Sequence, residues 1–271
     1  MDLSSDDIAS AIQTRHVLTD IQGALTFTGG EPQSKAAATL RTRDFDNAPV
    51  RLGGSIAGYV GRDDLDPNAG DPVEEKLRRL DESMLVSADA PLGQLMNWLS
   101  SKPLLFVVEH HQIVGLVTPS DLNKQPGRTY FYLLIAGLET ALADLIRSYF
   151  PDQAGAVSLL PEHRRKALNK RRGEQRDADV FADEIAAMYF TDLLDIVEAS
   201  HHLRRIFTVS DEGDWRGGVR EPLRRLRNQA MHPVKTLVRD RDGSLKRLTE
   251  MDVRLRDLLG AAHEALATSP A

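Results

Sequence analysis

Cysteine is absent from the 271-residue sequence. The chain therefore forms no disulfide bond, thiolate metal site or iron–sulfur cluster, and it has no cysteine nucleophile. Such a composition is typical of a protein from a reducing compartment. The first ten residues, MDLSSDDIAS, are acidic and carry no apolar run, so we expect no signal peptide and a cytoplasmic protein.

Long apolar segments are also scarce. The longest, residues 130–146, is interrupted by Glu139, Thr140 and Asp144. Because a membrane-spanning helix needs about 20 predominantly apolar residues, this segment predicts a buried helix and no membrane partner. Overall, 41% of the residues are hydrophobic and 27% are charged, a composition that favours a folded, soluble protein over a disordered one.

The net charge of −6 is unevenly distributed along the chain. Residues 1–126 contain 11 Lys and Arg against 18 Asp and Glu, whereas residues 127–271 contain 23 against 22. The basic residues of the second half gather in segments 161–176 and 220–235. An acidic half joined to a half with basic clusters predicts two domains with different partners. The Pro- and Gly-containing segment 124–128 marks their boundary, so we predict domains 1–126 and 127–271.

The first domain contains an internal repeat. Residues 47–65 match residues 104–122 at a shift of 57 positions, which places Asp64 on Asp121. Each segment has the pattern of two short strands joined by a turn and ending at a helix start, and a helix-like stretch precedes each one. The repeated unit is therefore strand, helix, strand, strand, helix, and such a repeat predicts two similar modules packed on each other.

The segment GLVTPSDL, residues 115–122, resembles the CBS family, whose paired β-α-β-β-α modules are also called Bateman pairs. The resemblance implies that the Thr118 hydroxyl contacts the phosphate or ribose of an adenosine nucleotide and that Asp121 accepts hydrogen bonds from both ribose hydroxyls. A carboxylate is a natural acceptor for a vicinal diol, and a hydroxyl beside free backbone N–H groups at a helix start suits a phosphate. The first module keeps Asp64 but has Gly61 in place of the threonine, so its site lacks that hydroxyl.

A structural interpretation of the same residues stays open. Thr118 or Ser120 can cap the helix that begins near Asp121, with no ligand involved. CBS pairs can also serve as dimerisation scaffolds without a nucleotide.

Residues 127–271 show the apolar spacing of helices. Four or five helices are expected, including one ending before Pro151, one beginning near Asp179, one from Val219 to before Pro233, and one over residues 249–267. Residues 210–218 are predicted to be a loop, and residues 240–245 a hairpin-like turn. Helices with short connections describe a bundle.

The segment LRRLRNQAMHP, residues 223–233, ends the third of these helices and contains Arg227, Asn228 and His232. It resembles the HEPN family of small helical domains, many of which are metal-independent ribonucleases with an Arg and a His separated by four to six residues. The resemblance implies that two protomers form one cleft from both motifs, with a polar residue of the first helix, here Glu139, facing it. The sequence thus predicts an α+β protein in which a CBS pair precedes an all-α HEPN-type bundle.

The motif residues suit a proton-transfer mechanism. Pro233 disfavours helical geometry for His232, so its imidazole lies at the helix end, where it can exchange protons with a ribose hydroxyl or a leaving oxygen. Arg227 can hold a phosphate and its developing negative charge. On a continuous helix Asn228 and His232 share a face, whereas Arg227 and His232 are about 140° apart. The alternative is a structural Arg–His pair in a domain without activity.

No metal site is predicted. Glu198 and His202 are four residues apart, as a helical metal pair would be, but no third ligand accompanies them. The basic segment 161–176 has no interleaved aromatic residue, so we interpret it as a solvated helix face rather than an RNA-binding surface.

These features together lead us to expect a nucleotide-regulated, metal-independent endoribonuclease that cleaves single-stranded RNA as a homodimer. A toxin or an effector of prokaryotic antiviral defence would have this activity. The protein is expected to require no cofactor and to take an adenosine nucleotide as a regulatory ligand. The alternative is a non-enzymatic adenosine-nucleotide sensor, or a dimeric module that binds RNA or another partner without cleavage.

Overall fold

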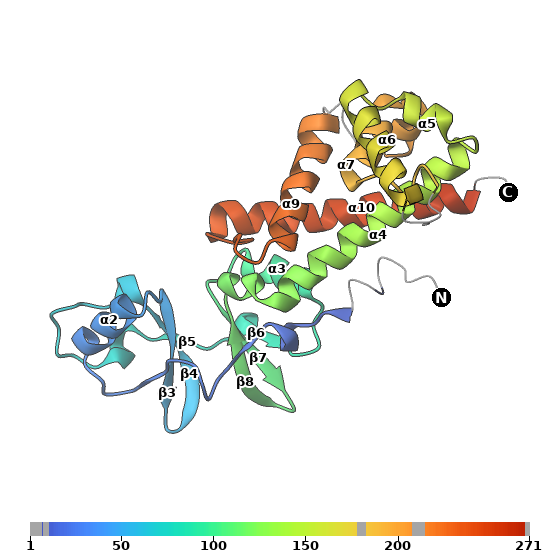
Figure 1. Ribbon diagram of the computed structural model, residues 1–271. Helices are drawn as coiled ribbons and strands as arrows, with labels where there is room; N and C mark the ends of the chain where they lie inside the picture. Colours follow the sequence, from blue (N-terminus) through green and yellow to red (C-terminus); the bar gives the residue numbers. More distant parts are fainter. Residues whose placement is uncertain (1–6, 8–10, 178–182, 208–214, 269–271) are drawn as a thin grey trace. The chain divides into compact units, whose positions relative to one another are not determined.

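The computed structural model describes residues 7, 11–177, 183–207 and 215–268 (Figure 1). The chain is a mixed α+β protein that divides into two compact units. Among the described residues, the front unit holds 11–127 and 238–246, and the helical unit holds residue 7, 128–177, 183–207, 215–237 and 247–268. The main division falls after Gly127, one residue beyond the predicted boundary. Residues 238–246 also belong to the front unit, and no sequence pattern predicts that this later segment does so.

Two four-stranded mixed sheets form the front unit. The strand order is β2-β3-β4-β5 in the first and β1-β8-β7-β6 in the second. In each sheet one pair, β2/β3 or β6/β7, is parallel, and the other pairs are antiparallel. The strands are β1 Thr19–Asp20, β2 Phe27–Thr28, β3 Asn47–Leu52, β4 Ser55–Gly61, β5 Arg78–Arg79, β6 Leu85–Ser87, β7 Leu105–Glu109 and β8 Gln112–Val117.

One helix connects the parallel strands of each sheet: α2 (Gln33–Thr42) in the first module and α3 (Leu92–Leu99) in the second. The β-α-β-β order therefore occurs twice, as the repeat predicts. The last helix predicted for each module is only a short 3₁₀ turn, Arg62–Asp64 in the first and Pro119–Asn123 in the second. Further 3₁₀ turns are Thr14–His16, Val73–Lys76 and Glu82–Met84.

The central hairpins of the two modules repeat in detail. Each contains a bulge whose extra residue is Ala57 in β4, opposite Val50 and Arg51, or Val114 in β8, opposite Val107 and Val108, and these positions are 57 residues apart. A bulge bends its strand and increases the local twist, so both hairpins curve at the same place. The repeat is therefore present in the backbone geometry and not only in the residue pattern.

The two-residue turns of these hairpins also correspond, but their residues differ. Gly53 and Gly54 have φ of +57° and +85°, and His110 and His111 have φ of +47° and +65°. A tight hairpin turn favours this left-handed region because it matches the twist of the strands. Glycine adopts it freely, whereas a residue with a side chain loses about 1–2 kcal/mol.

A hydrophobic cluster joins the two modules inside the front unit. Tyr59 of β4 packs with Phe106 of β7 and Leu116 of β8, and all three side chains are buried. The first module also has its own core between α2 and its sheet, formed by Phe27, Ala36, Ala37, Leu40, Ala48, Val50, Val60, Leu65 and Val73.

Helices build the second unit (Figure 1). They are α4 Gln125–Tyr149, α5 Ala154–Ser158, α6 Glu162–Asp177, α7 Phe190–Ala199, α8 His201–Ile206, α9 Glu221–Met231 and α10 Lys246–Thr268. Wide π-type turns, Arg216–Arg220 and Arg241–Leu245, lead into α9 and α10. The Tyr130 hydroxyl of α4 donates to the buried Asp252 of α10, so these two helices are joined by a polar contact as well as by apolar packing.

Helix α4 is long and apolar enough to cross a membrane by length and composition alone. Half of its most apolar 18-residue window is buried inside the protein. Its apolar side chains at helical spacing pack in the core of the helical unit; the buried ones include Phe131, Leu134, Leu138, Leu142 and Leu145. This packing agrees with the buried helix expected for the segment.

Three expectations for the helical unit need correction. The second predicted helix is two helices, because α7 begins at Phe190 and the chain breaks at Ser200, which adopts an extended conformation and caps α8. Asp179, its predicted start, lies outside the described residues. Residues 240–245 form a π-type turn instead of a hairpin turn, because the Asp240 carboxylate caps the N–H groups of Gly243 and Ser244.

The third correction concerns the basic segment, which is not simply a solvated face. On α6, Arg164 and Arg171 both bind the fully buried Asp192 of α7, with N–O distances of 3.2 and 2.7 Å. Arg172 pairs with Glu184 at 2.6 Å. Leu168 is the one buried apolar side chain of α6 among its described side chains, residues 162–174, so ion pairs largely hold this helix in place.

Candidate functional site

Thr118 and Asp121 lie at the start of the 3₁₀ turn that follows β8. Thr118 is the N-cap residue in an extended conformation, and Pro119 occupies the first position of the turn. The Asp121 carboxylate accepts hydrogen bonds through Oδ2 from the Thr118 backbone N–H at 2.7 Å and from its hydroxyl at 2.8 Å. These bonds agree with the alternative that Thr118 and its neighbours cap the turn without a ligand. The acceptor, however, is the Asp121 carboxylate and not a Thr118 or Ser120 hydroxyl.

The other oxygen of Asp121 is occupied as well. The Thr19 hydroxyl donates to Oδ1 at 3.0 Å, and the Lys124 ammonium lies 2.7 Å from the same atom. A carboxylate has about four lone-pair sites, and here four donors use them. Asp121 is also only 6% exposed. A ribose could therefore bind Asp121 only after displacing one of these donors.

Asp64 occupies the corresponding place in the first module, three residues after Gly61. It forms a two-bond ion pair with Arg78, with Nε–Oδ2 at 2.9 Å and Nη2–Oδ1 at 2.8 Å. Hydrogen bonds from Arg78 hold the pKa of Asp64 below its usual range. The side chains remain accessible, at 31% exposure for Asp64 and 53% for Arg78. This module thus presents a carboxylate and a guanidinium together at the surface.

The partners of the two aspartates correspond in position. Arg78 lies on β5 opposite Tyr59, and Thr19 lies on β1 opposite Leu116, which is 57 residues after Tyr59. In each module, therefore, a side chain from an edge strand donates a hydrogen bond to the aspartate. Sequence reasoning missed both partners because β1 and β5 lie outside the repeated segments, and only the strand pairing brings them to the site.

The predicted catalytic motif lies at the end of α9. Arg227 and Asn228 are on the helix, which ends at Met231. His232 is extended, with φ −113° and ψ 103°, and it is exposed. The expected release of His232 from the helix before Pro233 is confirmed. It also means that helical geometry does not stack His232 on Asn228.

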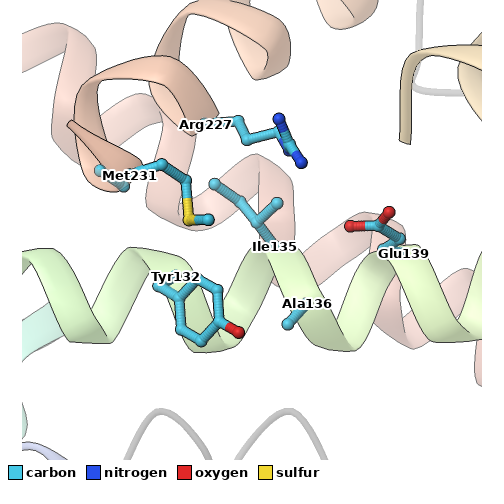
Figure 2. A pocket seen from close by; sticks show the side chains of 7 residues that line it. Tyr132, Ile135, Ala136, Glu139, Arg227 and Met231 are labelled. Carbon is cyan, nitrogen blue, oxygen red and sulfur yellow. The ribbon is translucent and has the colours of Figure 1, made fainter. Parts of the chain in front are cut away.

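A pocket of about 160 Å³ lies between α4 and α9 in the helical unit (Figure 2). It brings together Glu139 and Arg227, which come from different helices, whereas Asn228 and His232 are not among its lining residues. Figure 2 shows Tyr132 and Met231 toward one end and Glu139 toward the other. The lining residues are Tyr132, Ile135, Ala136, Glu139, Arg227, Ala230 and Met231.

Burial dominates the electrostatics of Glu139. It raises the pKa of the carboxyl, while the positive charge of Arg227 and the backbone N–H of Phe190 act in the opposite direction. Phe190 begins α7, and a helix N-terminus favours negative charge. Within the described residues, neither Glu139 nor Arg227 forms an ion pair within 4 Å. The pocket therefore holds two opposite charges that are near each other but not in contact.

Arg128 holds the turn that follows α9. This buried side chain donates to the backbone oxygens of Gln229 at 2.7 Å, His232 at 3.3 Å, and Lys235. It fixes the backbone at His232 while the imidazole stays exposed. No sequence signal identifies this role, because it depends on the packing of α4 against the turn.

The described residues contain no group of three or more His, Asp or Glu side chains that could hold a metal ion. Glu198 lies 3.6 Å from Arg220. The His202 ring packs against that of Tyr149, with centroids 5.2 Å apart. Both members of the Glu–His pair considered from the sequence thus have other neighbours.

Comparison with known proteins gives similarities of structure only. No family model matches the chain, and no curated protein matches it. The chain is similar to the CBS domain of a bacterial CNNM/CorC-family Mg²⁺ transporter in complex with ATP, at 19% identity and a TM-score of 0.38, over 44% of this chain and 89% of that one. It is also similar to a hemolysin-like CBS protein of Oenococcus oeni, at 16% identity and a TM-score of 0.37, over 44% and 95%. CBSX2 in complex with AMP shows 16% identity and a TM-score of 0.36, over 41% and 92%. All three are CBS-domain proteins.

Proposed function

We propose that the protein is an adenosine-nucleotide sensor whose front unit is a CBS pair. The observation that carries this proposal is the duplicated module. The same bulge, turn and edge-strand pairing recur 57 residues apart, and Asp64 and Asp121 stand at equivalent places after the last strand. The GLVTPSDL segment, on which the CBS resemblance rests, lies at this position of the second module.

The accessible ligand groups are those of the first module. Asp64 can accept hydrogen bonds from ribose hydroxyls, and Arg78 can bind a phosphate through its planar fork of donors. Both side chains are partly exposed, whereas all acceptor sites of Asp121 are used by protein donors. We therefore place the principal ligand contacts at Asp64 and Arg78 and give Thr118 and Asp121 a mainly structural role. On sequence alone, the missing hydroxyl at Gly61 favours the opposite assignment.

Calorimetric titration with AMP, ATP and S-adenosylmethionine tests this proposal. AMP and ATP are the ligands named for two of the similar structures. We expect Asp64→Asn to weaken binding by about 1.5–3 kcal/mol, the range for hydrogen bonds to a charged group. The matched control is Asp63→Asn, because Asp63 is a neighbouring carboxylate at 98% exposure. No binding of any of the three compounds would contradict the sensor. Binding with unchanged affinity in Asp64→Asn would contradict the placement of the ligand at Asp64.

Metal-independent cleavage of single-stranded RNA is the second candidate, and one observation favours it. The pocket joins Glu139 of α4 to Arg227 of α9, and His232 follows directly at the end of α9. In this scheme Arg227 holds the phosphate, His232 transfers the proton, and a second protomer completes the cleft. The enzyme would then be a HEPN-type toxin or defence effector under nucleotide control.

A gel assay on single-stranded RNA separates this candidate from the sensor. Wild type should cleave RNA but not DNA, and EDTA should not prevent cleavage. His232→Ala should abolish cleavage, whereas His263→Ala, a change of an exposed histidine on α10, should not. A wild-type protein that is inactive with and without AMP or ATP would leave the sensor as the function.

A further inference from the structure

The pocket between α4 and α9 has a composition that restricts its ligand. Its walls are apolar, since Ile135 and Ala230 are buried, while Tyr132 is 46% exposed. Its charged groups are Glu139 and Arg227. A guanidinium offers only donors, and an ionised carboxylate offers only acceptors.

The two charged groups of the pocket do not pair with each other. No ion pair within 4 Å joins Glu139 and Arg227, so the carboxylate and the guanidinium can each bind a group of a ligand. A ligand that satisfies both must carry acceptors for Arg227 close to donors for Glu139. A lone phosphate would meet the carboxylate, and a lone ammonium the guanidinium, so repulsion disfavours both. An uncharged ring that carries both kinds of group satisfies the two charges without repulsion.

Guanine carries both kinds of group on adjoining edges. Its O6 and N7 atoms are the acceptors that arginine contacts bidentately in nucleic-acid recognition, and its N2 amino group is a donor beside the N1–H. A carboxylate can accept from both donors. An aromatic side chain such as Tyr132 can stack on the face of a base.

We propose that this pocket binds a guanine base, with Arg227 on its acceptors and Glu139 on its donors. The base can come from a free nucleotide or from RNA. The inference rests on neither function proposed above. Arg227 on a base and Arg227 on a scissile phosphate are alternative uses of one side chain, so the test measures binding and not cleavage.

Calorimetry with the full-length protein, using guanosine, inosine and adenosine, tests the proposal. Inosine is the matched ligand, because it keeps O6, N7 and N1–H and lacks only the 2-amino group. Guanosine should bind about tenfold more tightly than inosine, the value of one hydrogen bond to a charged group, and adenosine more weakly still. Titration with GMP and with a short guanine-containing single-stranded RNA then distinguishes the two sources of the base.

The protein variant is Glu139→Gln, with Glu264→Gln as its control, since Glu264 is exposed on α10. Glu139→Gln should weaken guanosine binding about 10- to 100-fold and remove the preference over inosine, whereas Glu264→Gln should bind like wild type. Equal binding of guanosine and inosine by the wild type, or no binding of guanosine, would overturn the proposal. If Glu139→Gln does not fold, the comparison of the two ligands on the wild type decides alone.

Discussion

The two modules of the front unit share a backbone plan and differ in the chemistry placed on it. Each has a bulged hairpin, a two-residue left-handed turn, and an aspartate bound by an edge-strand side chain. In the second module the aspartate is buried under four protein donors, and in the first it forms an exposed pair with an arginine. Residues at equivalent positions can therefore have different roles: Asp121 stabilises the fold, whereas Asp64 is accessible to a ligand.

The largest expected effect is on stability at Asp121. Asp121→Ala should lower the free energy of unfolding by about 2–4 kcal/mol, because it leaves the Thr118 N–H and the Thr19 hydroxyl without their acceptor and the Lys124 ammonium without its counter-charge. Urea unfolding measures the loss. Asp64→Ala is the control and should cost less than about 1 kcal/mol, because both side chains of its ion pair are partly exposed and solvent screens the pair. Similar losses in both variants would remove the difference between the modules.

The hairpin turns provide a second test. His110→Asn combined with His111→Gly should stabilise the protein by about 1 kcal/mol, because Asn-Gly adopts the left-handed turn with less strain than two histidines. Gly53→Ala in the other module should destabilise it by about 1 kcal/mol for the same reason. Thermal and urea unfolding check both changes. If the Asn-Gly variant is less stable than wild type, the histidines make contacts that offset their strain.

The smallest effect concerns the titration of Asp64. Arg78→Ala removes the guanidinium whose hydrogen bonds lower the pKa of this carboxyl, so that pKa should rise toward the ordinary value for aspartate. An NMR titration of the Asp64 side chain measures the shift. The pKa of Asp64 is lower in the folded than in the unfolded protein, so its ionised carboxylate stabilises the fold at a pH above the pKa of the unfolded state. This stabilisation is lost as the pH falls through the pKa of the folded state. Arg78→Ala should weaken that dependence, and an unchanged titration would show that Arg78 does not control Asp64.

Local patterns predicted the parts of the fold that depend on local chemistry. The repeat predicts both hairpins because short apolar runs with Val and Ile, a turn and an aspartate recur at one spacing. The end of α4 before Pro151 and the release of His232 before Pro233 follow from the way proline restricts the residue before it. The capping role at Thr118 and Asp121 was likewise open to sequence reasoning, since hydroxyl and carboxylate residues at that spacing commonly begin a helix.

Contacts between distant residues were not predictable in this way. Arg78 binds Asp64 only because β5 pairs with β4, and Arg128 reaches the turn after α9 across about a hundred residues. The basic helix α6 was misjudged for the same reason, since its spacing gives no sign of the buried Asp192 that attracts two of its arginines. The sequence shows that these residues are charged, but tertiary packing determines which residue each one binds.

Amide hydrogen exchange of the front unit, with and without saturating AMP or ATP, shows directly which module holds the nucleotide. We expect added protection at residues 61–64 and 78–79 of the first module, where Asp64 and Arg78 are accessible, and little change at residues 118–121. Protection at residues 118–121 alone would show that the ligand displaces the donors of Asp121 and would contradict the assignment of the two modules. No change at either place would contradict nucleotide sensing by this unit.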